Sequence, residues 1–376
     1  MTDEMPLAPP PRIARLVLVT PEGAVVGRLA PVPVDLPWWQ DAQSVVRAAR
    51  NHHGIDVTIL RLLEAVRDRP HGGEVTYLAE VAQSVPAEAW AGQLQHHPLR
   101  QSYAEPGGPA ADLVWAASII AERGLALAGP PVQIRSWNLS SIWQIPVVGQ
   151  TLWLKVVPPF FVHEPRLITA LAGRPVPELL GHHRGRMLLT EVAGEDMHEA
   201  PLPRLLDMVT LLVELQSLWA GRVDQLRSIG LPDWGSQALT AAIGDVVERT
   251  SGELSRNDLV MLEGFVDDLA NRFAALGSCG LPDTLVHGDF HPGNLRGTER
   301  TLTLLDWGDS GIGHPMLDQP AFLVSVPSQH VKPIKDHWER AWLARLPGCE
   351  PARAASLLAP IAAARQAVIY RRFLDN

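Results

Sequence analysis

The sequence predicts an α+β fold with a small strand-rich lobe, a larger helical lobe and, before both, a further small α/β domain. Three observations support this fold class. The chain has 376 residues, which is too long for one ordinary hydrophobic core. Strand-like alternation of apolar and polar residues is concentrated before residue 192, and helical periodicity dominates after it. Glycine and proline crowd residues 105–109, which is the best candidate for a domain boundary.

Composition limits the function classes. Hydrophobic residues make up 46% of the chain and charged residues 19%, which is typical of a packed globular protein. The formal net charge of −9 argues against a nucleic-acid partner, because such a partner requires a basic face. Cys279 and Cys349 form no metal or disulfide motif, so we expect a reduced, cytoplasmic compartment. We expect neither a signal peptide nor a membrane span, since no apolar run approaches about 18 residues.

The first domain, residues 1–105, is expected to contain four strands and one helix. The helix over 40–53 carries apolar residues on one face, and Gly54 ends it. The strands alternate between apolar and polar residues, and a turn at 21–23 separates the first two. They are predicted at 13–19, 24–29, 59–66 and 75–81.

Residues 110–376 are expected to form the two lobes, with the small lobe over about 110–192 and the large lobe over about 193–376. The small lobe begins with a helix over 111–123, which Gly124 ends. Its other elements are strands at 132–137, 142–147, 151–157 and 186–192, and a short helix at 164–171. The large lobe has helices at 202–219, 258–276 and 352–374, the last with an interruption expected at Pro360.

A predicted hairpin in the large lobe carries the most informative polar residues. Asn294 opens its first strand and Asp306 closes its second, so the two side chains are expected to converge at its open end. A carboxylate and an amide oxygen, completed by water and phosphate oxygens, are what Mg²⁺ accepts. Asp289 lies on the loop that enters the hairpin, where it can take a proton from an incoming hydroxyl.

This pattern resembles a known family. His-Gly-Asp-x-x-x-x-Asn at 287–294, followed by Asp-Trp at 306–307, is similar to the catalytic and metal loops of aminoglycoside phosphotransferase/choline kinase-like enzymes. The Gly-x-Pro-x-x-Asp run at 313–318 is similar to a segment of the same family. The resemblance implies a bilobal protein-kinase-like fold, with ATP or GTP and Mg²⁺ as cofactors.

The resemblance also implies a role for each matching residue. Asp289 would be the catalytic base, and Asn294 and Asp306 would bind Mg²⁺. His287 and Asp318 would support these loops structurally. His291, which lies between them, is expected to pack within the loop.

The small lobe supplies candidate nucleotide-binding residues. Strand alternation places Trp153 and Lys155 on one face, where the lysine can reach phosphates and the indole can lie flat on adenine. Lys155 is the only lysine before residue 332. The alternatives are a solvated edge lysine and a tryptophan that belongs to the core. Glu164 resembles the family's lysine-pairing glutamate, or is a carboxylate that favours the start of a helix.

Two further segments are candidates for binding the nucleotide. The loop expected to cover the phosphates has no glycine, so Ser140 and Ser141 are candidate donors there, together with backbone amides. The strand that leads into the large lobe offers backbone groups to adenine. We predict that the Glu191 carbonyl and the Ala193 amide bind it.

The first domain resembles a Nudix domain in the order of its elements. Arg47, Gly54 and Ile55 match that family's signature. The positions of the metal-binding glutamates are instead occupied by Trp39, Ala48, Asn51 and His52. Without carboxylates the element cannot hold Mg²⁺ for pyrophosphate hydrolysis, so the domain is expected to be non-catalytic. Binding, support and homodimerisation remain as its possible roles.

We therefore predict a phosphotransferase that moves the γ-phosphate of ATP to a hydroxyl of a small molecule. Candidate acceptors are an aminoglycoside, an amino sugar, a choline-like molecule or another small alcohol. The alternative is a nucleotide-binding regulator with little transfer activity. Residues of the large lobe that are candidates for binding the acceptor are Asp309, Trp338, Glu339, Trp342, Tyr370 and Asp375.

Overall fold

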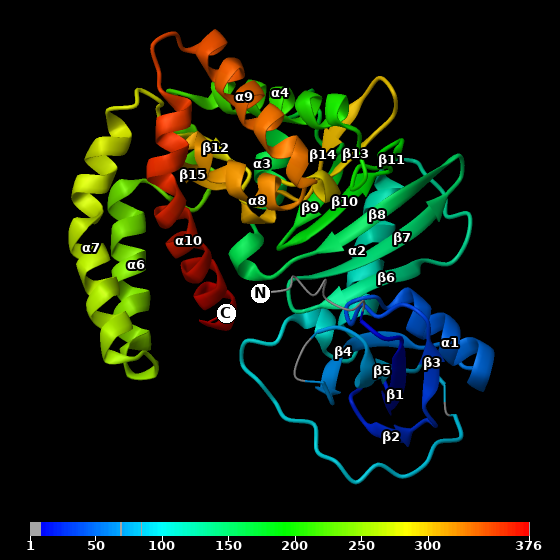
Figure 1. Ribbon diagram of the computed structural model, residues 1–376. Coiled ribbons are helices and arrows are strands. Elements are labelled where there is room, and N and C mark those ends of the chain that lie inside the picture. Colours follow the sequence, from blue (N-terminus) through cyan, green and yellow to red (C-terminus); the bar gives the residue numbers. More distant parts are fainter. Residues whose placement is uncertain (1–8, 68–69, 84, 376) are drawn as a thin grey trace. The chain divides into compact units, whose positions relative to one another are not determined.

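The computed structural model describes residues 9–67, 70–83 and 85–375, and its fold is mixed α+β (Figure 1). The contacts divide the chain into two compact units. The first ends at Val162 and also includes Glu178–Glu191. The second consists of His163–Pro177 and the chain from Val192 onward. The boundary expected at 105–109 stays a prediction, and Gly108 there begins a helix.

The first unit begins with a five-stranded sheet, and helix α1 (Gln43–His53) packs on one face of it (Figure 1). Its strands are β1 (Arg12–Val19), β2 (Val25–Arg28), β3 (Val32–Val34), β4 (Thr58–Ala65) and β5 (Gly73–Glu80). Strands β1 and β5 run parallel, and the other pairs are antiparallel. The predicted helix and four strands are confirmed, and Gly54 ends α1 with a φ of 69°. Strand β3 was not predicted, because three residues are too few to show an alternating pattern.

The second sheet of this unit is antiparallel, in the order β6-β7-β8-β10-β9. Its strands are β6 (Val132–Trp137), β7 (Ser140–Val147), β8 (Gln150–Val156), β9 (Leu179–His183) and β10 (Arg186–Thr190). Helix α2 (Gly108–Glu122) buries Ala116 and Ile120 against Leu152 and Leu154 of β8. The four predicted strands are confirmed, and β9 was not predicted.

Strand β6 joins the two sheets of the first unit. The buried side-chain amide of Gln133 accepts a hydrogen bond from the Ile59 amide (2.8 Å) and donates one to the Ile59 carbonyl (2.7 Å). The Ser136 hydroxyl donates to the Leu60 carbonyl (3.0 Å). Residues 40–42 also pair with the outer edge of β6 through backbone hydrogen bonds. Both edges of this strand are therefore covered, one by β7 and one by residues 40–42.

The second unit is mainly helical, and α6, α7 and α10 lie side by side in it (Figure 1). Its helices are α3 (Glu164–Ala170), α4 (Leu202–Trp219), α5 (Val223–Ser228), α6 (Ser236–Thr250), α7 (Arg256–Gly277), α8 (Gln319–Val324), α9 (Ser328–Arg345) and α10 (Pro351–Asp375). The interruption expected at Pro360 is wrong, because α10 continues through this exposed proline. A buried stripe along α10 holds the helix together on the other side.

Two small sheets complete the second unit. Their strands are β11 (Glu195–Asp196), β12 (Thr284–Val286), β13 (Leu295–Gly297), β14 (Leu302–Leu304) and β15 (Gly311–Gly313). Strands β13 and β14 form the predicted hairpin, with β11 beside β13, and β12 pairs with β15. All these strands are short, and they position the loops described below.

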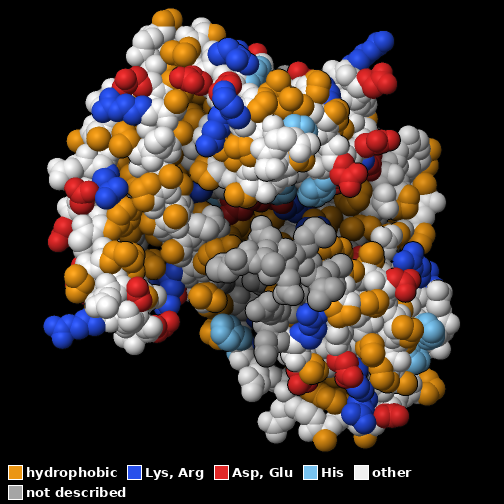
Figure 2. Space-filling view, viewed as in Figure 1, with side chains coloured by type: hydrophobic (Ala, Val, Ile, Leu, Met, Phe, Trp, Pro, Cys, Tyr) orange, Lys and Arg blue, Asp and Glu red, His pale blue; other side chains and the backbone are white. Residues whose placement is uncertain are grey.

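The helices of the described part of the chain are all too short or too polar to cross a bilayer. On the face drawn in Figure 2, basic side chains are interspersed with acidic ones over the helices of the second unit. Hydrophobic side chains lie among them on this face.

Candidate active site

The loop that follows β12 is held by one buried carboxylate. Asp318 accepts hydrogen bonds from the backbone amides of His287 (2.9 Å) and Gly288 (2.7 Å). It also accepts one from the side-chain amide of Gln216 (2.9 Å). Burial raises the pKa of Asp318, whereas these donors and the nearby cations favour its ionised form. Asp318 therefore fixes the direction in which the chain enters the loop.

Gly288 and His287 make this loop compact. Gly288 has a φ of 89°, and a Cβ built on it would lie 2.0 Å from the Asp309 carbonyl oxygen. The buried ring of His287 places Nε2 2.9 Å from the Leu305 carbonyl oxygen and lies 4.7 Å from the Trp307 ring. The loop is thus packed against the segment that follows β14.

The hairpin brings the predicted metal-binding residues to its open end. Asn294 lies in a short turn just before β13, and its carbonyl accepts a hydrogen bond from the Leu305 amide (2.8 Å). Asp306 follows directly, with an exposed side chain and a left-handed φ of 59°. Trp307 is buried, so the backbone turns between an outward carboxylate and an inward indole.

Asp289 and Asn294 are in direct contact. The Asn294 Nδ2 donates to the Asp289 carbonyl oxygen (2.8 Å) and to its carboxylate Oδ2 (3.1 Å). Because Nδ2 and Oδ1 are the two ends of one planar amide group, Oδ1 of Asn294 points away from these two Asp289 oxygens, where it can accept from or bind another group. The Asp289 side chain is 47% exposed, so an incoming molecule has access to it.

His291 forms an ion pair with Asp289, whose Oδ2 lies 3.5 Å from its Nε2. Burial raises the pKa of Asp289, but the contact with His291 and the charges of His291 and His287 outweigh it and lower the pKa overall. The same contact raises the pKa of His291. His291 therefore does more than pack within the loop, because its contact favours the ionised form of the Asp289 carboxyl.

The sequence did not identify Arg365 of α10. Its side chain is nearly fully buried, and its Cζ lies 4.8 Å from the centre of the Trp234 ring. Burial lowers the pKa of Arg365, and the carboxylates of Asp318, Asp309 and Asp289 oppose that effect. A signal was present, because Arg365 continues the buried helical stripe of Ala354, Leu358, Ile361 and Val368.

Three of the candidate nucleotide-binding residues, Trp153, Lys155 and Glu191, lie in the first unit. Trp153 and Lys155 are half-buried on one face of β8, while its alternate residues enter the core, as the alternation predicted. The Trp153 indole nitrogen donates to the Glu191 carboxylate. Ala193 lies exposed in the second unit.

Ser140 and Ser141 are placed differently from the expectation. Both side chains are buried, and their hydroxyls accept hydrogen bonds from the indoles of Trp137 (2.9 Å) and Trp143 (3.1 Å). These bonds tie the hydroxyls to the protein interior, so the structure does not favour them as phosphate donors. The backbone amides of the turn between β6 and β7 are the remaining candidates there.

Glu164 belongs to the second unit, whereas Lys155 belongs to the first. Glu164 is the first residue of α3, is buried, and accepts a hydrogen bond from the Trp307 backbone amide (3.2 Å). It therefore supports the turn after Asp306, and its pairing with Lys155 stays a prediction.

The candidate acceptor-binding residues are scattered. Trp338 and Trp342 are fully buried, so the expectation that they contact an acceptor is wrong. Asp375 pairs with Arg249 (2.7 Å) and Arg371 (3.2 Å). Tyr370 is exposed, in contrast to the two tryptophans. Asp309 and Glu339 are half-buried.

Residues 150–355, more than half of the chain, match the sequence profile of a family described as the phosphotransferase enzyme family. The chain belongs to this family. The resemblance seen in the sequence is confirmed, as is the expectation of an enzyme that transfers phosphate. The match does not include residues 1–105, so the Nudix-like first domain stays a prediction.

Several solved structures resemble the chain. A macrolide 2′-phosphotransferase type I has a TM-score of 0.51 at 19% identity, covering 70% of this chain and 92% of its own. The macrolide 2′-phosphotransferase MphH from Brachybacterium faecium has a TM-score of 0.48 at 16% identity, covering 69% of this chain and 93% of its own. A choline/ethanolamine kinase family protein from Mesorhizobium loti has a TM-score of 0.46 at 19% identity, covering 68% of this chain and 83% of its own. The first of these shows that the fold is shared. No curated protein matches the sequence.

Proposed function

We propose that this phosphotransferase transfers the γ-phosphate of ATP or GTP to a hydroxyl of a small molecule, with Asp289 as the base. The observation that supports this most directly is the contact between Asp289 and Asn294 at the open end of the hairpin. The exposed carboxylate of Asp306 follows the other strand of the same hairpin. Three oxygen-bearing side chains are thereby gathered on two loops.

The donor set fits Mg²⁺. The described residues contain no group of three or more His, Cys, Asp or Glu side chains suited to a metal, so an all-protein cage is not formed there. Mg²⁺ commonly takes one or two carboxylates together with phosphate oxygens and water. The Asp306 carboxylate and the Asn294 amide oxygen would hold it, and when bound it would neutralise charge on the phosphates.

Each remaining residue has a separate task in the proposal. Asp289 orients the acceptor hydroxyl and takes its proton, and its lowered pKa keeps it ionised at neutral pH. Lys155 binds phosphate oxygens as a point charge. Trp153 stacks on the base, and the Glu191 carbonyl and Ala193 amide bind its edge. His287, Glu164 and Asp318 hold the loops in place.

The proposed acceptor is a small alcohol of the aminoglycoside, amino sugar, macrolide or choline-like class. Two observations motivate this range. The solved structures that resemble the chain are named for macrolides, aminoglycosides, choline and ethanolamine. The accessible carboxylates of Asp289 and Asp306 make the rim of the site acidic, which suits an acceptor that carries an amine.

The test is transfer from ATP to a panel of these alcohols by the wild type and by Asp289→Asn. The amide cannot take a proton, so kcat should fall by at least about 10²-fold. The KM for ATP should change far less, because Asp289 is not proposed to bind the nucleotide.

Asp267→Asn is the matched control, since Asp267 is an exposed aspartate on α7. It should leave both constants unchanged. Full turnover by Asp289→Asn would show that the base lies elsewhere. Tight ATP binding by the wild type without transfer to any acceptor would indicate a nucleotide-binding regulator instead.

A further inference from the structure

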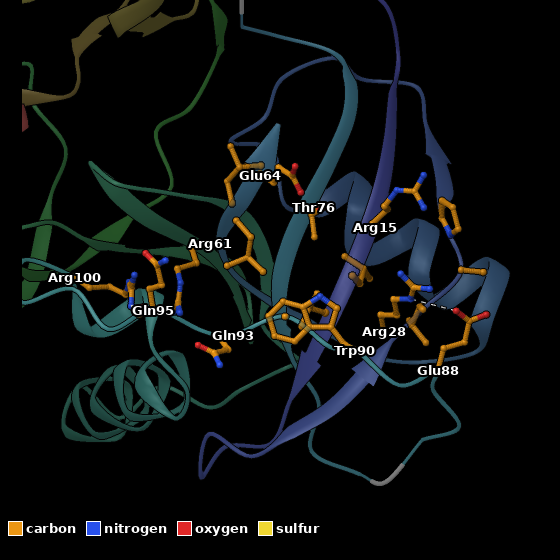
Figure 3. A pocket seen from close by; sticks show the side chains of 18 residues that line it. Arg15, Arg28, Arg61, Glu64, Thr76, Glu88, Trp90, Gln93, Gln95 and Arg100 are labelled. Atoms are coloured by element: carbon orange, nitrogen blue, oxygen red, sulfur yellow. Dashed lines mark hydrogen bonds and ion pairs between the residues drawn. The ribbon is translucent and has the colours of Figure 1, made fainter. Parts of the chain in front are cut away.

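The first domain contains a cavity of about 740 Å³ that the proposed phosphotransfer does not use (Figure 3). It lies on the face of the five-stranded sheet that faces away from α1. On β1, Leu16 and Leu18 point towards α1, whereas Val17 and Val19 belong to a second apolar cluster, against which Trp90 packs. A volume of this size is in the range of small-molecule sites, which span roughly 300–1,000 Å³.

A segment without helix or strand forms one wall of this cavity. It runs over 89–101 and contributes Trp90, Gln93 and Gln95. Glu88 fixes its beginning, because its backbone pairs with that of Arg28 in both directions (2.8 and 3.0 Å). Irregular segments longer than about 12 residues are uncommon within a compact domain, and those that are ordered often carry a function.

Arginines outnumber glutamates in the lining of the cavity, with four arginines and two glutamates. Arg15 pairs with Glu74 (2.9 Å) and Arg28 with Glu88 (3.2 Å), so these two arginines are compensated. The other lining glutamate, Glu64, is exposed. Figure 3 shows Arg61 and Arg100 at one end and Arg15 and Arg28 at the other, with Trp90 between them.

The uncompensated charge is concentrated at Arg61 and Arg100. Their side chains are only 13% and 18% exposed, and both pair with the single carboxylate of Glu105, at 3.3 and 3.1 Å. Within the described residues, the buried Nε of Arg61 has no hydrogen-bond partner. Burial and the charge of Arg100 lower the pKa of Arg61, in the direction expected for an under-compensated cation. Arg61 also donates to the Ala104 carbonyl (2.5 Å) and Arg100 to the Gln95 carbonyl (2.6 Å), so these two cations lack a second negative charge rather than an acceptor. An oxyanion placed here would supply that charge.

Trp90 supplies the second element of recognition. Its ring is half-buried and packs against the apolar cluster of Val17, Leu60 and Leu78, which holds it in one orientation. A rigid indole beside a cation is a surface on which a flat ring stacks. Gln93 is exposed close to it and can bind polar groups on the edge of such a ring.

We propose that this cavity binds a planar aromatic anion of mononucleotide size, with its phosphate or carboxylate at Arg61 and Arg100 and its ring against Trp90. The first domain is then a ligand-binding module. This does not depend on the proposed phosphotransfer, because every residue involved lies between Arg15 and Glu105.

Calorimetric titration of the full chain with AMP, adenosine and inorganic phosphate tests the proposal. AMP carries both the ring and the charge, and each of the other two probes carries one of them. We expect saturable AMP binding that is at least about tenfold tighter than that of either partial probe, because a charge-assisted contact and a stacked ring contribute separately. Equal affinity for AMP and inorganic phosphate would refute the role of Trp90.

Variants separate this cavity from the nucleotide site of the phosphotransferase. Arg61→Gln, Arg100→Gln and Trp90→Leu should each weaken AMP binding by at least about tenfold, which is the scale of one charged hydrogen bond or one stacked ring. Arg100→Gln leaves the bonds of Arg61 intact, so it is the variant least expected to disturb folding. The KM for ATP in phosphotransfer should stay unchanged in all three.

Arg47→Gln is the matched control, because it removes one exposed positive charge from α1, on the opposite face of the sheet. It should bind AMP as the wild type does. The proposal fails if AMP does not bind, if the cavity variants bind it as tightly as the wild type, or if the control loses as much affinity as they do. AMP bound only at the phosphotransferase site would produce the second of these results.

Discussion

His314 illustrates how one buried side chain couples the fold to pH. Burial lowers the pKa of His314 to about 4. Its Nδ1 accepts a hydrogen bond from the Met316 amide (3.2 Å), which a protonated ring cannot do. The unfolded chain therefore binds this proton more readily than the folded one. The free energy of unfolding is at its full value above about pH 6.5 and falls as the pH decreases towards 4. His163 acts in the same direction, because burial lowers its pKa to about 4 as well.

We predict that His314→Asn makes unfolding less sensitive to acid. Asparagine keeps an acceptor for the Met316 amide but does not titrate. Between pH 6.5 and 4, the variant should lose up to about 3 kcal/mol less unfolding free energy than the wild type. Denaturant unfolding at several pH values measures this. His52→Asn, at an exposed histidine, should leave the pH dependence unchanged. Identical acid sensitivity of His314→Asn and wild type would contradict the prediction.

Arg365 is the residue whose removal should disturb the candidate site most from a distance. Replacing it with methionine keeps an apolar stem but removes the cation that faces Asp318. We expect Arg365→Met to lower the free energy of unfolding by about 1–3 kcal/mol, because the buried carboxylate of Asp318 loses one of the two nearby cations that favour its ionised form.

Asp318→Asn should then lower the free energy of unfolding less in the Arg365→Met background than in the wild type. Unfolding of the four proteins in this double-mutant cycle gives the coupling energy, which should be at least about 1 kcal/mol. Simple additivity would mean that the two side chains do not interact.

Among the elements, the loop between β12 and β13 requires a glycine at position 288. Alanine at Gly288 would need a left-handed φ and would place its Cβ 2.0 Å from the Asp309 carbonyl oxygen. We predict that Gly288→Ala moves the adjacent Asp289 and lowers kcat at least about tenfold, since small displacements at a reacting centre are costly. Gly149→Ala is the control, because Gly149 also has a positive φ but nothing within 4 Å. Equal kcat for both variants would exclude a positioning role for the close contact.

Helices and strands could be predicted where the sequence pattern that specifies them lies within a few neighbouring residues. The alternation on β8 and the glycine after α1 depend on a few neighbouring residues, and both are confirmed. The interruption at Pro360 was predicted because a proline destabilises the helix locally. The buried stripe that outweighs this local destabilisation extends along all of α10. In the site, the open end of a short hairpin was likewise foreseeable from sequence spacing. The place of Arg365 on a buried stripe was visible in the sequence, but its approach to Asp318 is a tertiary contact that spacing does not reveal. The tryptophan partners of Ser140 and Ser141 lie only three and two residues away, so the sequence failed to show the burial of both hydroxyls rather than a distant partner.

At the scale of the whole molecule, the five-stranded sheet of the first unit supports the sheet that carries Lys155. Gln133 is the key contact, because its buried amide satisfies both backbone groups of Ile59. We predict that Gln133→Ala lowers the free energy of unfolding by about 2–4 kcal/mol, since two buried polar groups lose their partner. Denaturant unfolding measures this, with Gln144→Ala on the neighbouring β7 as the control. Equal losses would show that the contact contributes nothing specific.

The same contact also determines when, during synthesis, the backbone of Ile59 can complete its hydrogen bonds. Ile59 is made first, and the side chain that completes its hydrogen bonds follows 74 residues later. At roughly 5–20 residues per second, the delay is about 4–15 s. During this time the nascent β4 carries backbone groups that await their partner, as any open strand edge does. The rate of translation from residue 59 to residue 133 therefore determines how long the unpaired edge of β4 can form hydrogen bonds with a wrong strand.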